Sequence, residues 1–301
     1  MLIVHHNDHD GRFAAHLLGK MESDKGEQTR YLEANYGKIT KQDILDARKG
    51  PEPVVMVDFS LPAEDMVDLW AQVDMLWIDH HVSAINDVQK ALQNLSREEA
   101  KKCCMCVDSE KSGCLLAWEI THLDCAVPYG VRMIHEWDNG SSEYEVRVLA
   151  YGVMTRDQEP GVEGGAWDYI LDQNGTGICV DTIREDGETV LRYADAQFEE
   201  WFETIGYETT LAFDGTTYKV FAINAPLKHD AFSVLDPAVK ARVDLFARTT
   251  RNETEWTVTL YTSDDDSEID CSVIAKAFGG GGHKGAAGFR CESLPFGDGD
   301  A

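Results

Sequence analysis

The chain has 301 residues, 43% of them hydrophobic and 27% charged, and its formal net charge is −27 at pH 7. This length allows two domains of ordinary size, each with its own hydrophobic core. The negative charge argues against long duplex DNA as a partner, because proteins that track many phosphates normally carry a basic stripe.

Apolar stretches and cysteines give an expectation about location. No apolar stretch approaches 18 residues, so we expect no membrane association. The N-terminus has no basic segment followed by a long apolar stretch, and the eight cysteines are scattered unevenly, which favours reduced thiols in the cytoplasm. Cys103, Cys104 and Cys106 lack a second pair at zinc-binding spacing, so we interpret them as buried or incidental thiols.

Three short apolar runs in the first 85 residues each end in polar side chains. They are residues 1–4 before HHNDHDG, residues 54–57 before Asp58, and residues 75–78 before Asp79, His80 and His81. Short runs of this kind, rich in β-branched residues, are typical of parallel strands covered on both faces. Helical patterns over residues 11–21 and 62–73 alternate with them. The alternation predicts an α/β fold with a parallel sheet.

The polar clusters are expected to meet, because the carboxyl ends of the strands in such a sheet open on one edge. One such cluster alone is more simply a capping Asp or a surface His, whereas three at equivalent strand ends indicate a common site. Mixed carboxylates and imidazoles suit divalent first-row metals, manganese in particular. Two ions bridged by one carboxylate can clamp a phosphoryl group and lower the pKa of a shared water. Asp8 and Asp10, two residues apart, can each face a different ion.

The sequence HNDHDG (6–11), together with VDFS (57–60) and DHH (79–81), resembles the DHH phosphoesterase superfamily. Near the other end, IAKAFGGGGHKGAAGF (274–289) is similar to the glycine-rich signature of the DHH-associated domain. The resemblance implies a parallel-sheet α/β catalytic domain and a smaller mixed α+β C-terminal domain joined by a helix. The boundaries we predict are 1–186 for the catalytic domain, 187–206 for the connecting helix and 207–301 for the DHH-associated domain.

The resemblance also implies two divalent metal ions, with manganese favoured and magnesium or cobalt as alternatives. Carried over position by position, it assigns His6 and Asp8 to one ion, Asp10 and His80 to the other, Asp58 as the bridge between them, and His81 to the scissile phosphate.

Two positions have rivals. In inorganic pyrophosphatases of the superfamily the first His stands where this chain has Val4, so His6 must serve, or His5 by displacement, and we prefer His6. The resemblance also implies a fourth carboxylate after a short helix, and we choose Asp138 as that metal ligand over Asp157, which follows the apolar run 148–154.

Four glycines, 279–282, precede His283 and Lys284. A glycine run alone is most often a flexible linker. Here it lies between a helix and another compact segment, which favours close backbone approach to phosphate. We therefore predict substrate binding by Gly280, Gly281, Gly282, His283 and Lys284. The acidic run 264–266 predicts a turn between strands.

The HND-x-DG form of the first motif resembles the nanoRNase, or oligoribonuclease-like, subgroup more than the pyrophosphatases. Our leading hypothesis is a two-metal phosphodiesterase that hydrolyses short oligonucleotides, or linear or cyclic dinucleotides, to mononucleotides. Alternatives are a nucleotide phosphomonoesterase or pyrophosphatase, a non-catalytic nucleotide-binding protein and a single-strand exonuclease. The sequence leaves the oligomeric state open, a homodimer included.

Overall fold

The computed structural model describes residues 1–301 except 25, 27, 172–177, 264–266 and 298–301, so the turn expected at 264–266 lies outside the described residues. The chain divides into two compact units, Met1–Val190 and Leu191–Ala301. The division falls inside helix α10 (Ile178–Ile205), which starts before the helix expected over 187–206, and Gly206 belongs to the next strand. In the part of the chain described, no helix is both long and apolar enough to cross a membrane.

The first unit alternates strands and helices. Its five strands all pair in parallel in the order β2-β1-β3-β4-β5, which confirms the predicted parallel α/β fold. The strands are β1 (Leu2–His6), β2 (Arg30–Ala34), β3 (Val54–Val57), β4 (Met75–Asp79) and β5 (Cys104–Val107). The helices are α1 (His9–Asp24), α2 (Lys41–Ala47), α3 (Ala63–Gln72), α4 (Val82–Leu92), α5 (Arg97–Ala100), α6 (Gly113–Thr121), α7 (Tyr129–Asp138), α8 (Tyr144–Val153) and α9 (Ala166–Leu171).

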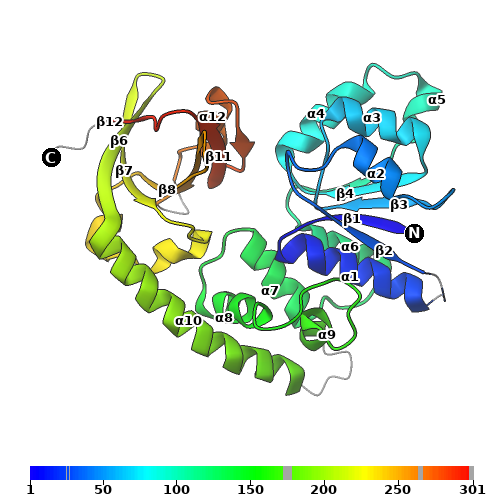
Figure 1. Ribbon diagram of the computed structural model, residues 1–301, viewed down its shortest axis with the longest axis horizontal. Coiled ribbons are helices and arrows are strands. Elements are labelled where there is room, and N and C mark those ends of the chain that lie inside the picture. The colour runs from blue at the N-terminus through cyan, green and yellow to red at the C-terminus, as the bar shows by residue number, and fades with distance from the viewer. Residues whose placement is uncertain (25, 27, 172–177, 264–266, 298–301) are drawn as a thin grey trace. The chain divides into compact units, whose positions relative to one another are not determined.

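Helices cover both faces of this sheet (Figure 1): α2, α3 and α4 lie on one face, and α1 and α6 lie on the other. Strand side chains alternate between the faces, so Val4, Met56 and Trp77 pack in one core cluster with Met66 and Leu69 of α3. Full burial of an aliphatic or aromatic side chain stabilises the fold by about 1.5–3 kcal/mol. These strands are therefore apolar along their length rather than alternating.

The strand ends are level. His5 of β1 pairs with Val57 of β3, and Val57 pairs with Ile78 of β4. The residue that follows each of these positions is His6, Asp58 or Asp79. The register therefore brings one residue from each of the three polar clusters to one edge of the sheet.

The second unit is a smaller mixed α+β structure, as expected. Its sheet has the order β10-β11-β9-β8-β7-β6-β12, in which β7 and β8 are parallel and the other pairs are antiparallel. The strands are β6 (Gly206–Phe213), β7 (Thr216–Asn224), β8 (Leu245–Arg251), β9 (Trp256–Thr262), β10 (Gly281–Gly282), β11 (Ala286–Cys291) and β12 (Phe296–Gly297). The helices are η1 (His229–Val234), α11 (Pro237–Lys240) and α12 (Cys271–Ala277), and α12 contributes Cys271, Ile274 and Ala275 to the core of this unit.

Candidate metal centre

The N-terminal turn of α1 fixes the positions of the residues in the first motif. Asp8 caps this helix, because its Oδ1 accepts the Gly11 N–H at 2.9 Å, while its Oδ2 lies 2.6 Å from His6 Nδ1. A Cβ on Gly11 would lie 2.6 Å from the His6 carbonyl oxygen. Only glycine therefore lets α1 begin so close to β1, and the tight turn holds His6 and Asp8 together.

Asp10 is held by a different helix. Its Oδ2 accepts the Gly113 N–H at 2.6 Å and its Oδ1 accepts the Cys114 N–H at 2.8 Å. These are the first two residues of α6, whose unpaired N–H groups and dipole favour a carboxylate. Asp10 is 1% exposed, so these two bonds fix the direction of a buried charge.

Asp58 lies between the other ligands. It directly follows β3, its backbone has a positive φ of 54°, and its side chain is 1% exposed. Its Oδ1 is 3.1 Å from His80 Nε2, and its Oδ2 is 3.7 Å from His6 Nδ1. One carboxylate thus faces imidazoles from two different strands.

Asp79, which the sequence analysis did not assign to the site, orients the two histidines after it. Its Oδ1 accepts the backbone N–H of His80 at 2.7 Å and that of His81 at 3.2 Å. The His81 Nδ1 donates to the same oxygen at 2.7 Å, which fixes the plane of the ring. Asp79 is the first residue of the DHH sequence, so the motif marked its position but not its role.

The structure distinguishes the two pairs of rivals by position. Asp138, the last residue of α7, has its Oδ2 3.3 Å from His80 Nε2, whereas the exposed Asp157 belongs to none of the described clusters. His6 faces Asp8 and Asp58, whereas His5 points its Nδ1 to the His6 carbonyl oxygen at 2.8 Å.

Among the residues that the structure describes, three groups of side chains could hold a metal ion, each with ligand atoms within 4.8 Å of one another. Every residue predicted as a metal ligand, together with His81 and Asp79, belongs to at least one of them. The groups are His6, Asp8 and Asp58; Asp10, His80 and Asp138; and Asp58, Asp79, His80 and His81.

The clustered carboxylates of the candidate metal centre favour a bound cation. Burial raises the pKa of both Asp58 and Asp138, and the charges of Asp8 and Asp10 raise each pKa further. Asp58 Oδ2 and Asp138 Oδ2 are buried without a hydrogen-bond partner among the described residues. Buried carboxylate oxygens are costly when unpaired. A divalent ion would satisfy them, so the residues present fit such an ion.

His81 has the opposite tendency. Burial lowers the pKa of His81, but the hydrogen bond to Asp79 and the charge of that carboxylate outweigh burial, so its pKa is raised. The imidazole is therefore biased toward its cationic form, which suits contact with a phosphate.

Residues 1–153 match the sequence model of the DHH family, N-terminal domain. The chain belongs to the DHH family. The motifs at 6–11, 57–60 and 79–81 all lie in the matched segment. Family membership, with the acidic and imidazole clusters at the sheet edge, makes this DHH protein a metal-dependent hydrolase of the phosphoesterase class.

Solved structures similar to this DHH protein include RecJ from Thermus thermophilus in complex with Mn²⁺, at 12% identity and a TM-score of 0.51. The alignment covers 96% of this chain and 49% of that chain, so this DHH protein spans about half of that RecJ, and the likeness supports the fold. The pGpG-specific phosphodiesterase PggH from Vibrio cholerae is 13% identical, with 97% of this chain and 93% of that chain covered and a TM-score of 0.48. No curated protein matches the sequence.

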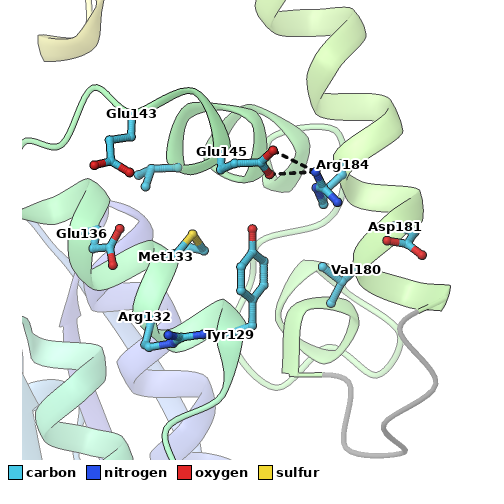
Figure 2. A pocket seen from close by; sticks show the side chains of 10 residues that line it. Tyr129, Arg132, Met133, Glu136, Glu143, Glu145, Val180, Asp181 and Arg184 are labelled. Carbon is cyan, nitrogen blue, oxygen red and sulfur yellow. Dashed lines mark hydrogen bonds and ion pairs between the residues drawn. The ribbon is translucent and has the colours of Figure 1, made fainter.

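A cavity of about 470 Å³ lies away from these clusters, between α7, α8 and α10. Figure 2 shows the Glu145 carboxylate directed at the Arg184 guanidinium on its wall, and these groups form an ion pair at 2.8 Å. None of its lining residues belongs to the three groups of candidate ligands. The cavity therefore does not supply the metal site.

The glycine-rich segment of the second unit is a hairpin. Gly281 and Gly282 form β10, which pairs with Gly288 and Ala287 of β11, and the His283 N–H donates to the Ala286 carbonyl at 2.8 Å. Gly282 has a φ of 142°. The close backbone approach that glycine permits here is to β11, and substrate binding by Gly280 to Lys284 stays a prediction.

Proposed function

We propose that this DHH protein is a two-metal phosphodiesterase that hydrolyses short oligonucleotides or dinucleotides, linear or cyclic, to mononucleotides. The observation that supports this proposal most strongly is the position of Asp58. Its carboxylate faces His6 on one side and His80 on the other, and one oxygen is buried without a hydrogen-bond partner in the described chain. A shared carboxylate between two ligand sets is what a two-ion centre requires.

In this proposal His6 and Asp8 hold one ion, and Asp10, His80 and Asp138 hold the other. Two such ions, when bound, supply Lewis acidity to the phosphoryl group and activate the attacking water. The chain's own residues fix the geometry: α6 orients Asp10, and the cap of α1 orients Asp8. Such prior orientation avoids reorganisation during the reaction.

We assign His81 to the scissile phosphate. Its Nδ1 donates to Asp79, which holds the proton on that atom and fixes the ring. The raised pKa favours a proton on Nε2 as well. That proton can be donated to a phosphate oxygen as negative charge develops in the transition state.

The experiment that tests this proposal is a substrate panel with purified protein and Mn²⁺. The panel contains a dinucleotide, a cyclic dinucleotide, a 3'-phosphorylated nucleotide, pyrophosphate and a single-stranded 24-mer. Release of mononucleotides from the dinucleotides supports the proposal. Preferential release of phosphate from the 3'-phosphorylated nucleotide or from pyrophosphate would favour a phosphomonoesterase or pyrophosphatase. Binding without turnover of any compound would indicate a non-catalytic protein.

The ion preference is the first testable consequence. We expect turnover with Mn²⁺ to exceed turnover with Mg²⁺ by roughly tenfold or more at saturating metal, because imidazole ligands such as His6 and His80 suit manganese better than magnesium. Steady-state rates across a titration of each metal check this. Equal maximal rates would count against imidazole ligation, and full activity in a chelator would exclude the metal centre.

The second testable consequence of the proposal concerns substrate length. With a net charge of −27, nucleotides that extend beyond the site meet repulsion rather than a basic track. We expect catalytic efficiency on a dinucleotide to exceed that on a 24-mer by at least about tenfold, with little loss as salt rises from about 50 to 300 mM. We retain His283 and Lys284 as the side chains proposed to bind the substrate end. Equal efficiency on the 24-mer, with a steep decline in salt, would instead support a single-strand exonuclease.

A further inference from the structure

Tyr36 borders the candidate metal centre without contributing a ligand to it. It lies just beyond β2, in a turn in which the Lys38 N–H donates to the Asn35 carbonyl at 3.0 Å. Gly37 supplies the positive φ of 74° that the turn requires. The turn presents the Tyr36 side chain at the same sheet edge where His6 ends β1, since His6 pairs with Ala34.

The Tyr36 ring contacts three other rings. Its centroid lies 5.0 Å from that of Phe59, 5.5 Å from that of His6 and 6.2 Å from that of His81. Phe59 is 1% exposed, and its carbonyl oxygen accepts the Trp77 Nε1–H at 3.0 Å, so it is a fixed support. The two imidazoles come from different strands and different metal groups. Tyr36 therefore has one side on a rigid residue and lies beside both parts of the centre.

Tyr36 as a residue is nevertheless 42% exposed, although its hydroxyl end is buried. A tyrosine that served only the core would be expected to bury its ring. Val82, which directly follows His81, is 43% exposed as well. Tyr36 thus lies beside the ring of the histidine assigned to the phosphate, and Val82 follows that histidine in the chain. An apolar part of the substrate would cover this surface beside the carboxylates and imidazoles.

We propose that Tyr36 is the stacking platform for a nucleobase of the substrate, with Val82 as the apolar rim beside it. This inference rests on the proposed function, since it takes the scissile phosphate to lie at the metal centre. The base and the phosphate of a nucleotide are separated only by the sugar, so a base next to that phosphate reaches the ring beside His6 and His81. Every nucleobase has a face that stacks on an aromatic ring, so the platform is tolerant of base identity.

The test compares a dinucleotide with two analogues, each lacking the base on one side of the phosphate. Tyr36→Leu removes the ring and retains a shorter apolar side chain. We expect the KM for the complete dinucleotide to rise about tenfold, within the usual range for loss of one stacked base. The KM for the analogue that lacks the stacked base should change less than about twofold, because no stacking is lost. Tyr36→Phe, which restores the ring, should recover most of the lost affinity.

Three readouts separate base stacking by Tyr36 from a role in positioning the imidazoles. If Tyr36 acted only by positioning His6 and His81, Tyr36→Leu would lower kcat, raise the Mn²⁺ concentration needed for half activation, and affect all three substrates equally. That result would overturn the inference. Tyr144→Leu is the matched control, because it removes a tyrosine that is 57% exposed on α8 of the same unit. This variant should change neither KM nor kcat.

Calorimetric binding of the dinucleotide in the presence of Mn²⁺ keeps this test distinct from that of the proposed function. A protein that binds the dinucleotide without cleaving it contradicts the phosphodiesterase proposal, and the ratio of dissociation constants between wild type and Tyr36→Leu then decides the stacking inference alone. A wild-type protein that neither binds nor cleaves the dinucleotide overturns both.

Discussion

Replacement of Asp58 by asparagine is expected to reduce turnover of a dinucleotide by on the order of 10³-fold or more, since loss of the shared ligand removes several kcal/mol of transition-state stabilisation. The Asp58 carboxylate faces both His6 and His80. Without its charge the two ligand sets no longer share a bridge. Steady-state kinetics across a Mn²⁺ titration measure the effect.

Asparagine is the appropriate replacement because the backbone at this position is left-handed, with a φ of 54°. Asn tolerates that conformation, whereas Asp58→Ala adds backbone strain to the loss of the ligand, although we expect it to abolish activity as well. Asp157→Asn is the matched control, since Asp157 is exposed and lies outside the clusters, and it should retain activity. Retention of activity by Asp58→Asn within about tenfold of wild type would sink the two-metal assignment.

The same variant should unfold at a higher temperature when metal is removed. Burial and the neighbouring carboxylates raise the pKa of Asp58, so its ionised form destabilises the metal-free folded state at neutral pH. The sign follows from linkage. When an acid has a higher pKa in the folded state than in the unfolded state, the free energy of unfolding falls as the pH rises above the acid's pKa in the unfolded state. A neutral amide removes that cost. Thermal unfolding in chelator at pH 7 measures the difference.

The parallel sheet and the ligand sites were accessible from sequence for one physical reason. A strand buried on both faces must be apolar along most of its length, so the apolar runs before His5, Asp58 and Asp79 marked the strands and, to within two residues, their ends. Parallel strands then align those ends at one edge. The structure brings the proposed ligands together there, including Asp138, which sequence reasoning placed only by resemblance.

Other features depend on contacts between distant segments. The role of Asp79 depends on its hydrogen bonds to His80 and His81, which a pattern of residue types does not encode. The position of Tyr36 beside the site requires the pairing of β2 with β1, which the residue pattern alone does not specify. The glycines near residue 280 predicted close backbone approach to phosphate, which stays a prediction, whereas the approach seen in the structure is to β11.

Gly113 is a further example, because its importance follows from where α6 begins. A Cβ at this position would lie 2.8 Å from Asp10 Oδ2 and 2.8 Å from the Cβ of Asp58. The backbone N–H of Gly113 also donates to Asp10. The absence of a side chain at residue 113 therefore lets the helix N-terminus reach one proposed ligand while it touches another.

We expect Gly113→Ala to lower turnover by about 10²-fold, because the added methyl group must displace Asp10, Asp58 or the start of α6, and misplacement of catalytic groups by about 1 Å costs that much. The Mn²⁺ concentration for half activation should rise, since both metal sites are disturbed. Stability should change far less than activity, because alanine favours the helix by up to about 1 kcal/mol over glycine and offsets part of the crowding.

Glu119→Ala, at an exposed position of the same helix, controls for substitution in α6. Wild-type turnover with an unchanged Mn²⁺ requirement would show that this contact does not position Asp10 and Asp58. Loss of the folded state in circular dichroism would instead show that the contact supports the core as much as the site.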